Sequence, residues 1–277
     1  MSLSDSFLYA GKRVLVVGGA SGMGAATAEL VKDAGADVVV MDVAESKLDG
    51  ATFIKLNLAE KDSIDAALAE LGDGKLDALF SCAGVADGTP GIERINFVGH
   101  RYLIDRLVEK GALGQGSAIG AISSAAGLGW EPNLESLRPL LEISDYDEGA
   151  KWLVDSGKAD YFNTKQALCA YVATQAYPLM KKGIRINAIC PGPTDTPLAQ
   201  ANKEMWLGFG ADYREEVGIE ASTPLEQAYP LVFLCSAAAG AISGITLVSD
   251  GGYFAAGRTD AYPPAADIAK FLLGLLS

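Results

Sequence analysis

The sequence predicts an α/β fold with a doubly wound parallel sheet. Short apolar runs rich in valine and isoleucine alternate with longer helical segments through most of the 277 residues, a pattern typical of a parallel sheet with helices on both faces. A glycine-rich turn, residues 18–24, joins the first predicted strand to the first predicted helix. The length allows one large domain or two small ones, with enough chain to bury a core.

The first strand, turn and helix predict a dinucleotide site. A valine-rich strand at residues 12–18 leads through the turn into a helix at residues 25–34. Glycines between a strand and a helix let the backbone approach a pyrophosphate, which the N-terminus of the helix stabilises. A flavodoxin-like turn that binds no dinucleotide is the alternative interpretation.

The second strand, residues 37–41, ends on a carboxylate, Asp42. Asp42 follows Gly24 by 18 residues, close to the ~20 expected of the acid that binds the adenosine ribose. A carboxylate at this place repels a 2′-phosphate, and neither Ser21 nor Val43 is basic. The cofactor is therefore predicted to be NAD rather than NADP.

The remaining segments continue the alternation of strands and helices. Strands are predicted at residues 52–57, 76–82, 117–124, 183–190 and 245–250, and helices at residues 61–71, 93–110, 159–182 and 224–238. The carboxyl ends of parallel strands form the crevice where such sheets bind ligands. Side chains that end or follow these strands are therefore candidates for a functional site.

Tyr161 and Lys165 lie at the head of the helix predicted at residues 159–182. Side chains four residues apart share one face of a helix, so the phenol and the ammonium can serve one small volume. A nearby cation favours the phenolate and lowers its pKa from the usual ~10, which makes the tyrosine an acid/base near neutrality. Taken alone the pair is weak evidence, because this spacing is common on solvated helices.

The glycine spacing and the order of the motifs resemble the short-chain dehydrogenase/reductase family. Gly18-x-x-x-Gly22-x-Gly24 matches the glycine-rich turn of that family, although Val17 stands where relatives usually have threonine. The resemblance spans residues 12–252 and implies a single-domain Rossmann fold with a parallel sheet of about seven strands. It also implies hydride transfer between NAD and an alcohol, in which the protein supplies orientation and electrostatics.

The resemblance assigns the chemistry to four side chains. Tyr161 exchanges a proton with the substrate hydroxyl, and Lys165 lowers the pKa of Tyr161 and binds the nicotinamide ribose. Ser124 ends a predicted strand, and its hydroxyl holds the substrate oxygen in the crevice. Asn96 positions a water that links the lysine to solvent as a proton relay.

The resemblance also implies a set of cofactor-binding residues. Ser81 and Cys82 replace both asparagines of the family's Asn-Asn-Ala-Gly motif, which puts local stability rather than chemistry in question. Asn57 replaces an aspartate beside the adenine and can still offer its carbonyl oxygen. The predicted cofactor-binding residues are Gly18, Ser21, Gly22, Met23, Gly24, Asp42, Val43, Asn57, Leu58, Cys82, Ala83, Gly84, Tyr161, Lys165, Pro191, Gly192, Thr194 and Thr196.

The chain between Ser124 and Tyr161 is longer than in most relatives. The extra segment, residues 128–158, predicts two short helices broken near Pro139 and again around residues 144–147. It resembles the insertion of the bacterial 3α-hydroxysteroid dehydrogenase/carbonyl reductase group and of the coniferyl-alcohol dehydrogenases. We expect it to wall the substrate pocket, to cover a subunit interface, or both. We hypothesise that it blocks the four-helix contact of tetrameric relatives and leaves a dimer.

Within a single domain of residues 1–277, two further segments carry apolar side chains. Residues 198–218 predict a mobile lid with several aromatic residues and few cations, which favours a bulky apolar alcohol or ketone as substrate. The tail, residues 253–277, ends in an apolar stretch that suits packing on a neighbouring subunit. A homo-oligomer, dimer or tetramer, is therefore expected.

Composition narrows the functional classes further. The net charge is −13, from 22 Lys and Arg against 35 Asp and Glu, which disfavours binding to nucleic acid. The four cysteines are far apart and His100 is the only histidine, so neither a metal site nor Ser-His-Asp hydrolysis is expected. No apolar run has the length of a membrane span and no signal peptide is evident, so a cytoplasmic protein is predicted.

The sequence thus predicts an NAD-dependent short-chain alcohol dehydrogenase/carbonyl reductase. Its expected reaction interconverts a bulky apolar secondary or aryl alcohol, hydroxysteroid-like, and the corresponding carbonyl. Two alternatives stay open. One is a non-catalytic NAD-binding sensor on the same fold, and the other is a ketoacyl-type carbonyl reductase, which a preference for NADPH would favour.

Overall fold

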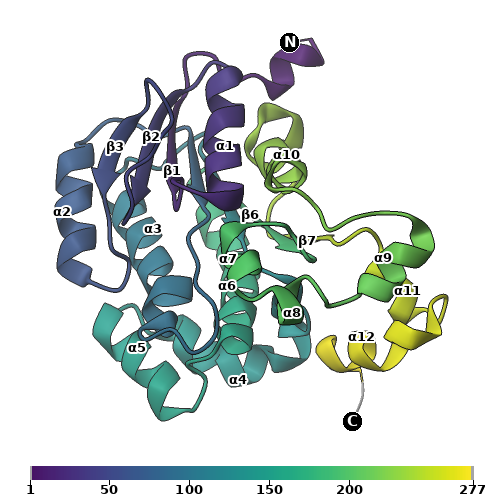
Figure 1. The fold of residues 1–277 in the computed structure, drawn as a ribbon. Helices are drawn as coiled ribbons and strands as arrows, with labels where there is room; N and C mark the ends of the chain where they lie inside the picture. The colour runs from purple at the N-terminus through teal and green to yellow at the C-terminus, as the bar shows by residue number, and fades with distance from the viewer. Residues whose placement is uncertain (1, 276–277) are drawn as a thin grey trace.

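The computed structural model describes residues 2–275 and contains one parallel sheet of seven strands (Figure 1). The strands are β1 Arg13–Val17, β2 Asp37–Asp42, β3 Thr52–Lys55, β4 Ala78–Ser81, β5 Ala118–Ile122, β6 Arg185–Pro191 and β7 Thr246–Ser249. Their order is β3-β2-β1-β4-β5-β6-β7, and every neighbouring pair is parallel. The strand order reverses between β1 and β4, which is the point where such sheets bind ligands. The predicted fold class and strand number are confirmed.

Helices cover both faces of the sheet. One face carries α1 Gly22–Asp33 and α10 Pro224–Cys235, and the other carries α2 Lys61–Leu71, α3 Gly99–Glu109 and α6 Tyr161–Met180. Successive residues of β1 alternate between the two cores, with Val14 and Val16 in one and Leu15 and Val17 in the other. Because both faces are covered, the strand is apolar at every position rather than at every second one.

The insertion forms two helices, α4 Trp130–Glu142 and α5 Tyr146–Asp155. They lie on the side of the sheet that carries α3 and α6 (Figure 1). Leu137 and Leu140 of α4 and Tyr146 and Leu153 of α5 are buried in the same core as the inner residues of α3 and α6. The insertion is therefore part of the main core and not a separate appendage.

Pro139 does not break the insertion, because α4 continues through it. A proline inside a helix removes the donor to the carbonyl four residues earlier, which here belongs to Glu135. Both residues are exposed, so water can bond that carbonyl. The prediction of a break near Pro139 is therefore wrong. The chain leaves the helix at Ile143 instead, and Asp145 caps α5 by accepting the backbone N–H of Asp147.

The C-terminal third adds short helices at one end of the sheet. The predicted lid, residues 198–218, contains α8 Lys203–Trp206, α9 Ala211–Val217 and all but the first residue of α7 Pro197–Ala201. The tail forms α11 Tyr253–Arg258 and α12 Ala266–Leu272. The rings of Phe209 and Tyr213 pack against Tyr253, with centroids 5.2 and 5.5 Å apart. These contacts join the lid to the tail. Residues 276–277 of the predicted tail lie outside the described residues.

No helix between residues 2 and 275 has the length and apolar character needed to cross a bilayer.

Candidate active site

A cavity of about 350 Å³ lies at the carboxyl ends of β1, β2 and β4, beside the N-terminus of α1. Predicted cofactor-binding residues form most of its wall: Gly18, Ser21, Gly22, Met23, Gly24, Asp42, Val43, Asn57, Leu58, Cys82, Ala83, Gly84 and Thr196. Ile95 and Leu198 also line it, although no motif pointed to them. Residues from six separate parts of the chain therefore surround one space.

Two glycines of the turn are required by close contacts. Gly18 has a φ of +80°, and a Cβ there would lie 2.4 Å from the backbone nitrogen of Ala83. A Cβ on Gly24 would lie 2.0 Å from the carbonyl oxygen of Gly18. The turn therefore brings the backbone of β1 directly against the start of α1. Because the Ser21 side chain does not cap α1, the first N–H groups of that helix remain available to an anion, and the cradle fits a pyrophosphate.

The Asp42 carboxylate is fixed at the end of β2 by two backbone groups. One oxygen accepts the N–H of Ala20 at 3.0 Å, and the other accepts the N–H of Ala44 at 3.1 Å. A carboxylate oxygen has a second lone pair, so Asp42 can still accept hydroxyl groups from a ribose. Val43 beside it is 61% exposed and carries no charge, so this end of the cavity lacks a cation for a 2′-phosphate.

Asn57 and Leu58 form the opposite wall of the cavity. The side-chain oxygen of Asn57 accepts the N–H of Ala59 at 3.0 Å, and its amide nitrogen donates to Glu60 at 2.8 Å. The carbonyl oxygen expected to face a ligand therefore already serves the local turn, with one lone pair left. Leu58 is 4% exposed, lines the cavity and belongs to the main core.

Ser81 and His100 form a hydrogen-bonded chain beside the segment where the family has two asparagines. His100 is 2% exposed, and its Nε2 lies 2.9 Å from the carbonyl oxygen of Ala83. A carbonyl only accepts, so Nε2 carries the proton, and Nδ1 accepts the hydroxyl of Ser81 at 2.5 Å. Burial lowers the pKa of His100 to about 4, so the ring is neutral. Burial also raises the pKa of the Cys82 thiol, which makes Cys82 an unreactive wall residue.

Tyr161 is the first residue of α6, and two carboxylates fix this end of the helix. Asp160 caps it by accepting the N–H of Asn163 at 2.8 Å, and Asp87 accepts the N–H of Tyr161 at 3.0 Å. Asp87 follows β4 in the loop that begins at Cys82, and no sequence signal linked it to Tyr161. The tyrosine is therefore held from the β4 side as well as by its own helix.

Lys165 lies one turn further along α6, beneath the Tyr161 ring. Its Nζ donates to the carbonyl of Ile122 at 3.1 Å and lies 5.7 Å from the centroid of the Tyr161 ring. The lysine is 4% exposed, and burial lowers its pKa to about 8. A Cβ on Gly84 would lie 3.4 Å from both Lys165 Nζ and Asn96 Oδ1, so these two polar groups meet at the same glycine.

Burial raises the pKa of the Tyr161 phenol, and the adjacent Ser124 hydroxyl lowers it in part. This direction is opposite to the lowering that the sequence predicted from Lys165. Burial of the phenol is the main cause, and the Lys165 ammonium bonds a backbone carbonyl at the end of β5. The phenol is therefore protonated at neutral pH and can donate a proton to a carbonyl oxygen placed beside it.

Ser124 and Asn96 reach this region from two other elements. Ser124 follows β5, and its Oγ accepts the N–H of Ala126 at 3.1 Å. Asn96 belongs to a π-helical turn, Arg94–Val98, that precedes α3, and it is 0% exposed. Its amide accepts the N–H of Val85 at 2.8 Å and donates to the carbonyl of Val85 at 3.0 Å. Asn96 thus fixes the loop that follows Gly84.

Pro191 ends β6, and the predicted residues after it lie beside the end of β7. The N–H of Gly192 donates to the carbonyl of Ser249 at 2.9 Å, and the Thr194 hydroxyl donates to the carbonyl of Gly192 at 3.0 Å. Thr196 caps α7 and is the member of this set that lines the cavity. The structure therefore places this segment at the rim of the site.

Trp206 of α8 packs on the ring of Tyr161, with centroids 5.1 Å apart and the planes inclined by 46°. This contact joins the lid to the start of α6, across 45 residues of chain. Ser124, Tyr161 and Lys165 do not line the 350 Å³ cavity. Within residues 2–275, no group of three or more His, Cys, Asp and Glu side chains is placed to hold a metal ion.

Two family models match the chain. The model described as short chain dehydrogenase matches residues 12–128, and the one described as Enoyl-(Acyl carrier protein) reductase matches residues 149–254. The interval between the two matches falls within the insertion. Cis-4-hydroxycyclohexanecarboxylate dehydrogenase of Sinomonas cyclohexanicum is 32% identical over 266 residues, which cover 89% of this chain and 98% of the relative. The chain belongs to the short-chain dehydrogenase family.

Further relatives agree with this assignment. Coniferyl-alcohol dehydrogenase of a Pseudomonas species is 29% identical, covering 87% of this chain and 96% of the relative. The 3-alpha-hydroxysteroid dehydrogenase/carbonyl reductase of Comamonas testosteroni is 30% identical, covering 86% and 95%. The crystal structure of the 3-alpha-hydroxysteroid dehydrogenase of Pseudomonas sp. B-0831 complexed with NADH has a TM-score of 0.72 at 27% identity, covering 89% and 98%. The predicted resemblance is confirmed, and this short-chain dehydrogenase is an oxidoreductase.

Proposed function

We propose that this short-chain dehydrogenase uses NAD to interconvert a bulky apolar secondary or aryl alcohol and its carbonyl. The observation that carries the proposal is the meeting of Tyr161 and Ser124 above the buried Lys165, next to a cavity that ends at Asp42. A proton donor, a hydroxyl that can hold an oxygen and a buried cation are the groups that alcohol oxidation and carbonyl reduction require.

The residues around the cavity fit NAD. The N–H groups of Gly22, Met23 and Gly24 at the start of α1 would bind the pyrophosphate, and Asp42 would accept the adenosine ribose hydroxyls. The other predicted cofactor-binding residues on the wall would enclose the same molecule, with Pro191, Gly192, Thr194 and Thr196 at its nicotinamide end. A related enzyme crystallised with NADH supports this choice. When bound, NAD supplies the hydride acceptor or donor.

Side chains of the protein donate and accept the proton. In the reductive direction, the Tyr161 hydroxyl donates its proton to the carbonyl oxygen, and in the oxidative direction the phenolate takes the proton of the alcohol. Ser124 would hold the same oxygen through its hydroxyl. Lys165, with a pKa of about 8, carries a charge at pH 7 that stabilises the phenolate and would bind the nicotinamide ribose. Asn96, close to Lys165 at Gly84, would position the relay water.

The apolar side chains of the lid favour an apolar alcohol that contains a ring. Trp206 covers the Tyr161 ring, and Leu198 lines the neighbouring cavity. Aromatic and aliphatic walls with a few convergent polar groups are typical of sites for apolar small molecules. The names of two relatives describe an aryl-type and a steroid alcohol, which supports this substrate class. A third relative is named for a hydroxycyclohexanecarboxylate, which shares the ring but carries a charge. A panel of 3-hydroxysteroids and cinnamyl-type alcohols with NAD would identify the preferred member.

The decisive test is the substitution Tyr161→Phe. It removes the phenol oxygen and preserves the ring that packs on Trp206, so we expect turnover to fall at least ~100-fold while NADH binding changes little. Tyr177→Phe is the matched control, because Tyr177 lies on the same helix and is 73% exposed. NADH formation is followed by its absorbance, and NADH binding by its fluorescence. Retained turnover in Tyr161→Phe would show that Tyr161 is not the acid/base.

A ketoacyl-type carbonyl reductase is the second candidate, because one matching family model is described as Enoyl-(Acyl carrier protein) reductase, which shares the acyl-carrier substrate although an enoyl reductase reduces a C=C bond. A preference of the wild-type enzyme for NADPH and an acyl-carrier substrate would favour it. A protein that binds NADH but oxidises none of the alcohols and reduces none of the carbonyls would instead be the NAD-binding sensor.

We also propose a homo-oligomer, with a dimer as the expected form. The insertion covers the start of α3 and packs on α6, which supports the hypothesis that it blocks a four-helix contact between subunits. Light scattering that gave the mass of a tetramer would contradict it. The four free cysteines suit a reducing compartment, and we propose the cytoplasm.

A further inference from the structure

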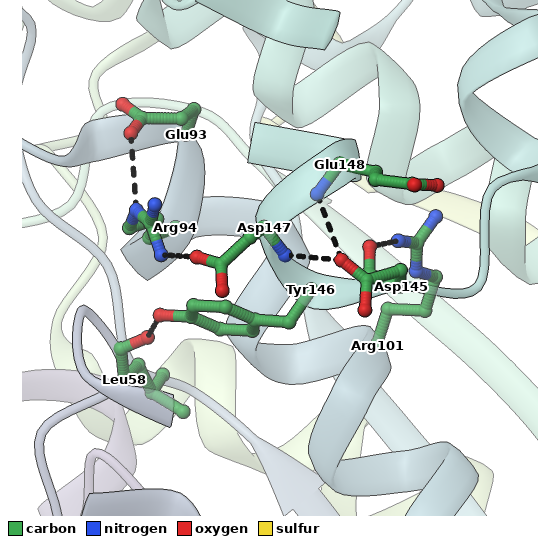
Figure 2. A network of polar contacts seen from close by, with 8 residues as sticks. All are labelled: Leu58, Glu93, Arg94, Arg101, Asp145, Tyr146, Asp147 and Glu148. Atoms are coloured by element: carbon green, nitrogen blue, oxygen red, sulfur yellow. Dashed lines mark hydrogen bonds and ion pairs between the residues drawn. The ribbon is translucent and has the colours of Figure 1, made fainter. Parts of the chain in front are cut away.

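The first turn of α5, in the insertion, contacts the loop that carries Leu58 (Figure 2). Tyr146 is 1% exposed, and its hydroxyl donates to the carbonyl oxygen of Leu58 at 2.7 Å. Leu58 is one of the residues that line the cavity, and it is 88 positions away in the chain. A buried hydroxyl from the insertion therefore holds the backbone of the loop that carries Asn57 and Leu58.

The Leu58 carbonyl lies in a closely packed, buried place where the Tyr146 hydroxyl is its hydrogen-bond donor. A Cβ on Gly99 would lie 2.6 Å from the Leu58 oxygen, so α3 passes directly against the same group. Because both Leu58 and Tyr146 are buried, a carbonyl that lost the phenol would remain in an apolar place without a partner, which is unfavourable. The loop would then be free to shift relative to the rest of the cavity.

A second contact links the same turn of α5 to the other wall. Arg94 lies over the Tyr146 ring, 4.9 Å from its centroid, and pairs with Asp147 at 2.8 Å. Arg94 belongs to the π-helical turn that also carries Ile95, which lines the cavity, and Asn96. The start of α5 therefore bridges two walls that come from different parts of the chain, as Figure 2 shows.

The insertion has its own attachment, independent of the Tyr146 hydroxyl. Arg101 of α3 is 3% exposed and donates to the carbonyl of Leu140 at 2.9 Å, near the end of α4. A Cβ on Gly149 of α5 would lie 2.7 Å from the Arg101 guanidinium. Removing only the phenol oxygen should therefore leave α5 in place and free the Leu58 carbonyl.

We propose that Tyr146 is a positioning residue for the adenine side of the dinucleotide site, because its hydroxyl fixes the wall formed by Asn57 and Leu58. The insertion thereby contributes to cofactor binding, in addition to any role toward substrate or a second subunit. This inference rests on the proposed function, which assigns the cavity to NAD.

The test uses ADP-ribose, which carries the adenine half of the cofactor and needs no turnover. We expect Tyr146→Phe to raise the Kd of ADP-ribose about fivefold in titration calorimetry, the loss expected of one buried hydrogen bond. Reduced nicotinamide mononucleotide lacks the adenosine, so its Kd from fluorescence should change less than about twofold. Tyr102→Phe is the matched control, since Tyr102 packs on Tyr146 with centroids 5.7 Å apart but donates to Asp65 at 2.7 Å.

Each outcome decides a different claim. An unchanged Kd of ADP-ribose in Tyr146→Phe, or an equal loss for the mononucleotide, overturns the positioning role. Wild-type protein that binds no ADP-ribose contradicts the assignment of the cavity to NAD instead. Should Tyr146→Phe not fold, Tyr146→Met removes the same hydroxyl and fills the space with a flexible apolar side chain, and an ADP-ribose Kd raised by less than about twofold then overturns the proposal.

Discussion

Replacing Lys165 by methionine should stabilise the protein at neutral pH while removing its activity. Lys165 is 4% exposed, and burial lowers its pKa from 10.5 to about 8. At about 1.4 kcal/mol for each pH unit, keeping this ammonium charged in the folded state costs about 3 kcal/mol. Methionine has a similar length and needs no charge, so that cost disappears in Lys165→Met.

The gain is offset in part by one lost hydrogen bond. Lys165 Nζ donates to the carbonyl of Ile122, and a buried carbonyl without a partner costs about 1–3 kcal/mol. We therefore expect Lys165→Met to raise the free energy of unfolding by about 1 kcal/mol at pH 7, or the Tm by about 2–4 °C. Lys182→Met, at an exposed position just after α6, is the control and should change stability little.

The pH dependence gives the stronger test. Below pH 8 the lysine is charged in both the folded and the unfolded protein, so the full penalty is present in the wild type. Between pH 8 and 10.5 the folded state releases the proton first, and the wild type gains stability relative to the variant. Urea unfolding at pH 7 and near pH 10 should therefore show the advantage of Lys165→Met shrinking and then reversing. A variant that is less stable at pH 7, or a difference that does not vary with pH, would refute the reasoning.

Two further substitutions test separate features. Asp42→Ala should raise the KM for NAD at least ~10-fold and reduce the preference for NAD over NADP, because the carboxylate that repels a 2′-phosphate is gone. The control is Asp37→Ala, at the exposed start of the same strand, which should leave the KM for NAD and the cofactor preference unchanged. Equal changes of the KM in the two variants would argue against a contact between Asp42 and the ribose. Pro139→Ala should raise the Tm by several degrees, because it restores a donor inside α4 worth about 1–3 kcal/mol. Pro132→Ala is the control, because Pro132 lies in the first turn of α4 where no helical donor is lost, and it should change the Tm much less. A lower Tm for Pro139→Ala would show that Pro139 stabilises α4 and would contradict the prediction.

The local sequence was sufficient to predict a feature of the site wherever the physical cause of that feature is local. The glycine at 24 follows from how closely a strand end and a helix start approach each other, because a Cβ there would meet the Gly18 carbonyl. Asp42 is placed by the length of one helix and one strand, and it lies on the cavity wall. Tyr161 and Lys165 share a face because an α-helix repeats every ~3.6 residues. None of these features depends on distant parts of the chain.

Distant contacts decided what the sequence could not. Burial raises the pKa of Tyr161, opposite to the lowering that the sequence predicted from Lys165, and the ammonium of Lys165 bonds the Ile122 carbonyl of a neighbouring strand. His100 carries no motif, yet the fold places it between Ser81 and the Ala83 carbonyl. Pro139 stays within its helix because its face of α4 is exposed to water.

The sequence by itself determined the sheet, its glycine-rich turn and the placement of Tyr161 and Lys165 on one helix face, because periodicity and spacing along the chain encode them. Only the tertiary structure decided which distant contacts fix these residues and how burial shifts their pKa values. The contacts of Tyr146 with Leu58 and of Trp206 with Tyr161 join segments 88 and 45 residues apart. Such contacts depend on how helices pack over the sheet, and burial, which sets the pKa of Lys165 and Tyr161, exists only after that packing.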